Sequence, residues 1–317
     1  MNTELNLLDH ELTPEICYEL LPEWKGTDVR ITQLSGGITN KLYRIQSVKG
    51  DCTVRIYGDK TDLFINRDHE AHSIKQMHKL GVCAPLVKYI PERNVTIVGF
   101  IDDAIVLNND SFLDKSLYPK IVAPIRKIHS SDVRLQRIFN PLTEIKKMAG
   151  ILTNLKVDYP EFDIVNTIDR LIRLSDIIDL PESDYSPSHN DLLADNFLLI
   201  KEEAKDRYEF PMYIIDWEYA GMAPKYYDIA DMFQETLIPR EAEIQIVEEY
   251  CVGCDFAQTL RYIDLYKPFP DIYWFLWSLI QINISKIKFD YYSYGQTKYN
   301  NAIENLKFIK NEYRVVV

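Results

Sequence analysis

The 317-residue sequence predicts an α+β fold with two lobes: a small N-terminal lobe built on an antiparallel sheet and a larger, mostly helical C-terminal lobe. The chain is at the upper limit of the length that one hydrophobic core usually supports, which favours two lobes. Strand-like segments bounded by turn formers fill residues 29–57, whereas helical apolar spacing dominates beyond the acidic pair Asp102 and Asp103. We therefore expect one lobe at residues 1–102 and the other at 103–317.

The N-terminal lobe is expected to contain strands followed by one helix. Within residues 29–57, three β-rich runs are separated by a Ser-Gly-Gly break and by a short turn at residues 49–51. From Asn66 to Leu80 the apolar residues recur at helical spacing, and Gly81 follows as a stop signal. Residues 95–101 form a short apolar run that is typical of a buried strand.

The C-terminal lobe departs from helical spacing at two short apolar runs. Residues 197–200 and 212–216 flank a polar segment, and this pattern predicts a hairpin joined by a turn. The most apolar run of the chain, Ile272 to Ile284, is too short to span a bilayer. We expect no membrane insertion.

Composition excludes several functional classes. Apolar residues make up 46% and charged residues 26% of the chain, so the protein is expected to be globular. The net charge of −12 would repel a nucleic-acid backbone, so no nucleic-acid partner is expected. The first residues lack a signal-peptide pattern, which favours a cytoplasmic location. The cysteine count is odd, and we interpret Cys251 and Cys254 as structural or incidental.

The segment from His189 to Asn196 carries the sharpest chemical signal. It has the His-x-Asp-x4-Asn spacing of a kinase catalytic loop, with Asp191 in the central position. Asp216 follows at the end of an apolar strand, where a metal-binding carboxylate would lie. In phosphoryl transfer a carboxylate orients the attacking hydroxyl, and Asn and Asp oxygens hold Mg²⁺. This pattern predicts Asp191 as the base and Asn196 and Asp216 as metal ligands; the alternative is that these residues are turn or cap residues.

The same chemistry requires a cation on an upstream strand, paired with a helix carboxylate. Arg55 and Glu70 fit this requirement, and a surface ion pair is the alternative. A flexible turn between two strands could close its backbone N–H groups over nucleotide phosphates, or it could be an ordinary hairpin. This turn contains Gly36, Gly37, Ile38, Thr39 and Asn40.

Taken together, these motifs resemble the choline/ethanolamine kinase family, a branch of the protein-kinase-like and aminoglycoside-phosphotransferase fold. The resemblance covers roughly Leu34 to Asn305. It rests on SGGITNKLYRI, TVRIYG with INRDHEAHSI, SHNDLLADNFLL, IIDWEYAGMAPKYYDIADMF and WFLWSLIQINISKIKFDYYSYGQTKYNNAI. Protein kinases have Lys at the position of Arg55, whereas choline kinases have Arg. The resemblance implies ATP and Mg²⁺ as cofactors, a small amino alcohol as acceptor, and Glu235 as the acid of the substrate pocket.

An aromatic-rich segment supplies candidate substrate contacts. Trp274 and Trp277 share a helix face, and Phe289 and Tyr294 could fold back onto it. Ring faces attract a quaternary ammonium ion, although such rings are often plain core. We therefore predict a choline kinase that forms phosphocholine and ADP. The alternatives are an ethanolamine kinase, an aminoglycoside-type phosphotransferase or a catalytically silent binding module; a monomer and a homodimer both stay open.

Overall fold

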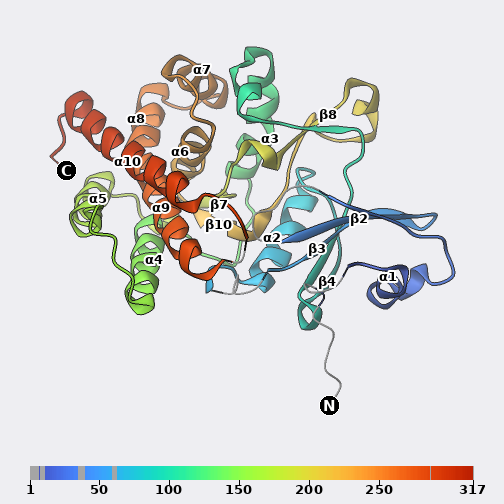
Figure 1. Ribbon diagram of the computed structural model, residues 1–317. Helices are drawn as coiled ribbons and strands as arrows, with labels where there is room; N and C mark the ends of the chain where they lie inside the picture. The colour runs from blue at the N-terminus through green and yellow to red at the C-terminus, as the bar shows by residue number, and fades with distance from the viewer. Residues whose placement is uncertain (1–6, 8–10, 35–39, 59–62, 286, 317) are drawn as a thin grey trace.

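The N-terminal part of the chain folds around an antiparallel sheet in the computed structural model, which describes residues 7, 11–34, 40–58, 63–285 and 287–316 (Figure 1). Within these residues the sheet has the strand order β1-β2-β3-β5-β4. Its elements are α1 (Pro14–Leu20), η2 (Pro22–Trp24), β1 (Arg30–Gln33), β2 (Lys41–Ser47), β3 (Gly50–Ile56), α2 (Arg67–Lys79), β4 (Leu86–Ile90), η4 (Pro91–Arg93) and β5 (Val95–Gly99).

Side-chain alternation along β3 gives the sheet two different faces. Val54 and Ile56 are buried with residues of α1 in one apolar cluster. Arg55 lies between them in sequence and therefore projects from the opposite face, where it reaches Glu70 of α2. Helix α2 begins after Asn66, whose side chain accepts hydrogen bonds from two backbone N–H groups of the first turn. The strand-then-helix prediction is confirmed.

Two local features differ from the sequence prediction. Strand β4 was not predicted; it lies at the sheet edge beside β5, and Pro85 and Pro91 flank it. The predicted strand 95–101 is shorter in the structure and ends at Gly99, although the backbone N–H of Phe100 still donates to the carbonyl of Asp51 in β3.

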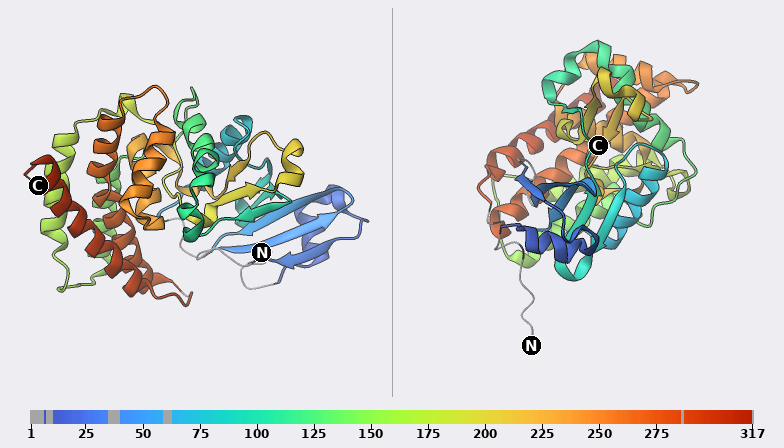
Figure 2. Two further views of the ribbon diagram at one scale, coloured as in Figure 1. Left: turned by 90° about the horizontal axis from the view of Figure 1, so that it is seen from above. Right: turned by 90° about the vertical axis from the view of Figure 1, so that its right-hand side faces the viewer.

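The C-terminal part is mostly helical and contains two small sheets. Figure 2 shows the blue strands of the first sheet at one end of the molecule and the red helix α10 at the other. The helices are α3 (Tyr118–His129), α4 (Pro141–Leu155), α5 (Ile164–Ile178), α6 (Lys225–Thr236), α7 (Arg240–Tyr250), α8 (Phe256–Tyr266), α9 (Pro268–Ile284) and α10 (Tyr291–Tyr313). The 3₁₀ helices are η5 (Asn109–Leu113), η6 (Lys115–Leu117), η7 (Glu182–Asp184), η8 (Ala194–Asn196), η9 (Glu202–Arg207) and η10 (Trp217–Tyr219).

The predicted hairpin forms two strands of a three-stranded sheet. Strands β8 (Phe197–Ile200) and β9 (Met212–Ile214) pair antiparallel, and β6 (Ala104–Val106) adds to the other edge of β8. The segment between β8 and β9 contains η9 rather than a simple polar turn. A second small sheet pairs β7 (Ser186–Ser188) with β10 (Gly221–Ala223). Together these strands hold both ends of the segment that contains Asp191.

Helices α9 and α10 run side by side (Figures 1 and 2). They bring together the predicted aromatic residues Trp274 and Trp277 of α9 and Tyr294 of α10. Every residue from Pro268 to Gln281 of α9 is buried, as expected for a core helix. A side chain at Gly295 of α10 would overlap Ser278 of α9, so this glycine allows the close approach. Of the helices in the described part of the chain, none is long and apolar enough to cross a membrane.

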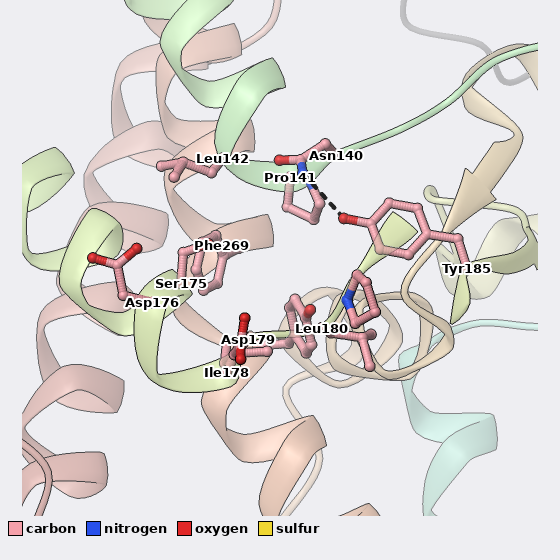
Figure 3. A pocket seen from close by; sticks show the side chains of 12 residues that line it. Asn140, Pro141, Leu142, Ser175, Asp176, Ile178, Asp179, Leu180, Tyr185 and Phe269 are labelled. Carbon is pink, nitrogen blue, oxygen red and sulfur yellow. Dashed lines mark hydrogen bonds between the residues drawn. The ribbon is translucent and has the colours of Figure 1, made fainter. Parts of the chain in front are cut away.

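A pocket of about 230 Å³ lies between α4, α5 and the start of α9 (Figure 3). Its wall includes Tyr185, which accepts a hydrogen bond from the Asn140 side chain at 3.1 Å, and the ring of Phe269. None of its lining residues is one of the predicted site residues. Beyond α7, Cys251 and Cys254 are joined by a disulfide bond.

Candidate active site

The loop between β7 and β8 carries Asp191 and Asn196. Both side chains are nearly buried, with Asp191 6% and Asn196 7% exposed. The Asn196 amide donates a hydrogen bond of 2.9 Å to the backbone carbonyl of Asp191. This bond fixes the distance between the two residues, so the spacing read from the sequence corresponds to one compact loop.

Two aspartates of α6 hold this loop from behind. Asp228 accepts hydrogen bonds from the backbone N–H groups of His189 and Asn190, at 3.0 and 2.7 Å, and contacts the His129 ring at 2.9 Å. Asp231 accepts the N–H of Leu192 at 2.7 Å. These carboxylates replace the sheet hydrogen bonds that the irregular loop lacks. They position Asp191 through the backbone.

Asp216 lies next to this loop. It follows β9 in the left-handed backbone region, with φ of 68°, and η10 begins directly after it. The neighbouring Ile215 donates its N–H to the carbonyl of Asn196 at 3.0 Å. Asn196 and Asp216 are thus brought together by the pairing of β8 with β9.

Arg55 contacts carboxylates from both lobes. Its Nη1 atom lies 3.2 Å from Glu70 Oε1 and 2.5 Å from Asp216 Oδ1. Burial by itself would lower the pKa of Arg55, but the charges of Asp216 and Glu70 outweigh this effect and raise it above the ordinary value. The predicted pair of Arg55 and Glu70 exists, and it is mostly buried rather than on the surface.

Arg55, Glu70 and Asp216 belong to a larger group of ion pairs, here called the carboxylate network. Its other two members, Arg67 and Glu218, were missed by the reasoning from sequence. Arg67 Nη1 lies 2.7 Å from Glu70 and 2.8 Å from Glu218. Burial, followed by the charge of Asp216, raises the pKa of Glu218 to about 7. The sequence signal that could have identified Glu218 is its position two residues after Asp216, in the turn that Asp216 begins.

The carboxylates of this region suit a hard divalent cation. Oxygen atoms of Glu70, Asp216 and Glu218 all lie within 4.8 Å of one another. Carboxylate and amide oxygens, such as those of Asp216 and Asn196, are the donors that Mg²⁺ prefers over nitrogen and sulfur. The residues present therefore fit a magnesium ion.

Of the predicted phosphate-covering turn, only Asn40 lies within the described residues. Gly36, Gly37, Ile38 and Thr39 lie outside them. The Asn40 side chain accepts the N–H of Gly58 at 3.3 Å and donates to Glu218 at 3.4 Å. This end of the turn is therefore anchored beside the carboxylate network.

The predicted aromatic residues form a continuous ring cluster between α9 and α10. Ring centroids are 5.7 Å apart for Trp274 and Trp277, 6.5 Å for Trp277 and Tyr294, and 5.9 Å for Phe289 and Tyr294. The two tryptophans are nearly buried, while Phe289 is 41% exposed at the edge. All four predicted rings thus meet in space.

Glu235 joins this ring cluster from α6. The Tyr294 hydroxyl donates to its Oε1 atom at 3.1 Å. One helical turn earlier, Asp231 accepts the indole N–H of Trp274 at 2.8 Å while holding the Asp191 loop. The Asp191 loop and the ring cluster are therefore connected through α6.

Asp191 lies between the carboxylate network and the ring cluster. Burial is the main cause that raises its pKa well above the ordinary value, and the charges of Asp231 and Asp216 add to it. Glu235 also contributes to this shift. A buried carboxyl group perturbed by several neighbouring acids is typical of a catalytic site.

These features define a class of protein: a phosphotransferase with a two-lobed, protein-kinase-like fold. The crystal structure of choline kinase LicA from Streptococcus pneumoniae has this fold, with a TM-score of 0.77 and 24% identity over 93% of this chain and 98% of that one. The structure of an ethanolamine kinase from Plasmodium vivax matches with a TM-score of 0.73 and 21% identity, over 90% of this chain and 84% of that one.

The chain belongs to the choline/ethanolamine kinase family, whose family model matches residues 31–251. A probable ethanolamine kinase from Arabidopsis thaliana is 28% identical, covering 90% of this chain and 83% of the relative. The family consists of ATP-dependent phosphotransferases that act on an alcohol group and use Mg²⁺. The predictions of family, fold class, enzyme class and cofactors are thus confirmed.

Proposed function

We propose that the protein is a choline kinase, which transfers the γ-phosphoryl group of ATP to the hydroxyl group of choline. The observation that carries this proposal is the ring cluster beside Asp191, in which Trp274, Trp277 and Tyr294 converge with Glu235. Ring faces bind a trimethylammonium group, each contributing about 0.5–2 kcal/mol when desolvated. A neighbouring carboxylate adds attraction for its positive charge.

In the proposed reaction, Asp191 orients the choline hydroxyl and accepts its proton. The raised pKa of Asp191 means that its carboxylate form is disfavoured as long as no positive charge offsets the surrounding acids. A bound cation reverses this effect, because positive charge nearby favours the ionised carboxylate. Binding of the cationic acceptor is therefore expected to help convert Asp191 into the base.

Asn196 and Asp216 are the proposed ligands of Mg²⁺. When bound, the ion neutralises negative charge on the nucleotide phosphates. Arg55 is the proposed contact for the phosphates, with Glu70 holding its guanidinium at 3.2 Å. Because Arg55 also contacts Asp216 at 2.5 Å, phosphates that bind Arg55 would free Asp216 for the metal. The anchored Asn40, with Gly36, Gly37, Ile38 and Thr39, is proposed to cover the phosphates.

Ethanolamine is the second candidate acceptor. A primary ammonium group prefers carboxylate acceptors over ring faces, and Glu235 offers such an acceptor. The Arabidopsis relative is also named an ethanolamine kinase. The ring cluster favours choline, since four rings meet there and the two carboxylates that contact them, Asp231 and Glu235, already accept donors from the rings.

An acceptor panel tests the proposal. Product formation from [γ-³²P]ATP would be followed with choline, ethanolamine and an aminoglycoside. We expect the highest kcat/KM for choline. Higher kcat/KM for ethanolamine would reverse the choice of acceptor, and no transfer to any of the three would favour a catalytically silent binding protein.

A further inference from the structure

Lys298 of α10 is a buried cation that contacts the proposed acceptor site. Only 3% of this residue is exposed. Its Nζ atom lies 2.7 Å from Glu235 Oε1 and donates a 2.6 Å hydrogen bond to the backbone carbonyl of Gln234. An ammonium group has three N–H donors, and at this depth they need protein acceptors.

The ammonium group of Lys298 also lies against the ring cluster. Its Nζ atom is 5.5 Å from the centroid of the Tyr294 ring, within the range of a cation–π contact. The Tyr294 hydroxyl donates to the same Oε1 atom of Glu235. One carboxylate oxygen therefore receives two donors from the protein itself, before any substrate binds.

The charge of Lys298 persists in this environment. Burial acts to lower the pKa of Lys298, but the charges of Glu235 and Asp271 outweigh it and raise the pKa above its ordinary value. The lysine is thus a permanent hydrogen-bond donor at neutral pH. It contacts the Glu235 oxygen at 2.7 Å and the Gln234 carbonyl at 2.6 Å.

Choline and ethanolamine differ in what they need from these acceptors. The trimethylammonium group of choline has no N–H donor and requires only ring faces and a favourable potential. The ammonium group of ethanolamine carries three N–H donors, and each one left without an acceptor in a desolvated site weakens binding. A site whose carboxylate oxygen is already bonded therefore disfavours ethanolamine.

We propose that Lys298 is a specificity-determining residue, which selects choline over ethanolamine by occupying the Oε1 atom of Glu235 and the backbone carbonyl of Gln234. The inference rests on the proposed function, because it concerns the acceptor of that same site. This role of Lys298 is distinct from that of the rings, which attract both choline and ethanolamine.

The test is the ratio of kcat/KM for choline to kcat/KM for ethanolamine in wild type and in Lys298→Met. Methionine keeps the unbranched shape of the side chain, one atom shorter, and removes its donors, so ethanolamine can reach the freed acceptors. We expect the ratio to fall about tenfold, with KM for MgATP unchanged. Lys298→Arg keeps both charge and donors and should retain the wild-type ratio. Lys310→Met, an exposed position on the same helix, is the matched control.

Separate outcomes distinguish this inference from the function. If wild type transfers phosphate to neither amino alcohol, the proposed function fails. If wild type is active but Lys298→Met leaves the ratio unchanged or raises it, the inference alone is wrong. Should Lys298→Met not fold, Lys298→Leu and wild-type inhibition replace it. Leucine also lacks donors and should lower the ratio, and tetramethylammonium should inhibit wild type more strongly than methylammonium. Equal inhibition by the two ions would overturn the inference.

Discussion

Replacing Asp228 with alanine should reduce both stability and turnover. This carboxylate is 1% exposed. It accepts hydrogen bonds from the backbone N–H groups of His189 and Asn190, and it contacts the ring of His129. Asp228→Ala leaves these three polar groups buried without their acceptor. The loop that positions Asp191 then loses its main anchor.

The size of the effect follows from these three contacts. A buried polar group without a partner costs about 1–3 kcal/mol, so three of them cost on the order of 3–6 kcal/mol once partial relaxation is allowed. A domain has only about 5–15 kcal/mol of stability in total. We therefore expect Asp228→Ala to lose roughly a fifth or more of the free energy of unfolding.

Urea unfolding of wild type and Asp228→Ala measures this loss. Burial acts to raise the pKa of Asp228, but the hydrogen bond and charge of His129 outweigh it, and the pKa falls below the ordinary value. A lowered folded-state pKa contributes stability above the unfolded-state pKa of about 3.9, and this stability is lost as the pH falls further. The difference in free energy of unfolding between wild type and Asp228→Ala should therefore be constant near neutral pH and shrink below about pH 4.

An exposed aspartate on another helix serves as the control. Asp176→Ala on α5 should unfold within about 0.5 kcal/mol of wild type, as surface substitutions usually do. If Asp228→Ala also stays within that range, or keeps full turnover, then the α6 carboxylate does not hold the loop and the reasoning is refuted.

Three further predictions concern individual site residues. Trp277→Leu should lower kcat/KM for choline by about 2–30-fold, the equivalent of 0.5–2 kcal/mol, and affect ethanolamine less; an equal loss for both would contradict the ring-face argument. Asp216→Asn should remove the Mg²⁺ dependence of ATP binding, measured by calorimetry with and without the ion, and an unchanged dependence would exclude Asp216 as a ligand. Burial, then the charge of Asp216, raises the pKa of Glu218 to about 7, so its proton stabilises the fold below pH 4.5 and this contribution is lost as the pH rises through 7. Between pH 4.5 and 8, urea unfolding should show wild type losing about 3 kcal/mol relative to Glu218→Gln, and parallel pH profiles would disprove this.

Local patterns made the loop and its chemistry predictable from the sequence. The spacing of Asp191 and Asn196 is a property of one short segment, and the strand leading to Asp216 has its own apolar signature. Helix α2 was marked by Asn66 at one end and Gly81 at the other, so its position could be read locally.

Contacts between distant segments were not predictable in the same way. Arg67 and Glu218 are 151 positions apart, and neither carries a local signal for the other. Their ion pair depends on how α2 packs against η10, which only the folded chain determines. The same holds for Lys298, whose partner Glu235 lies on a different helix. Strand β4 was missed because its five residues are stabilised by pairing with β5 rather than by their own pattern.

Turnover of choline by Asp191→Ala tests the central claim most directly. Loss of a general base usually costs about 10²–10⁴-fold in rate, so we expect a fall in kcat of that size while MgATP binding and the unfolding midpoint stay close to wild type. A variant that still phosphorylates choline within about tenfold of the wild-type rate would show that Asp191 is not the base.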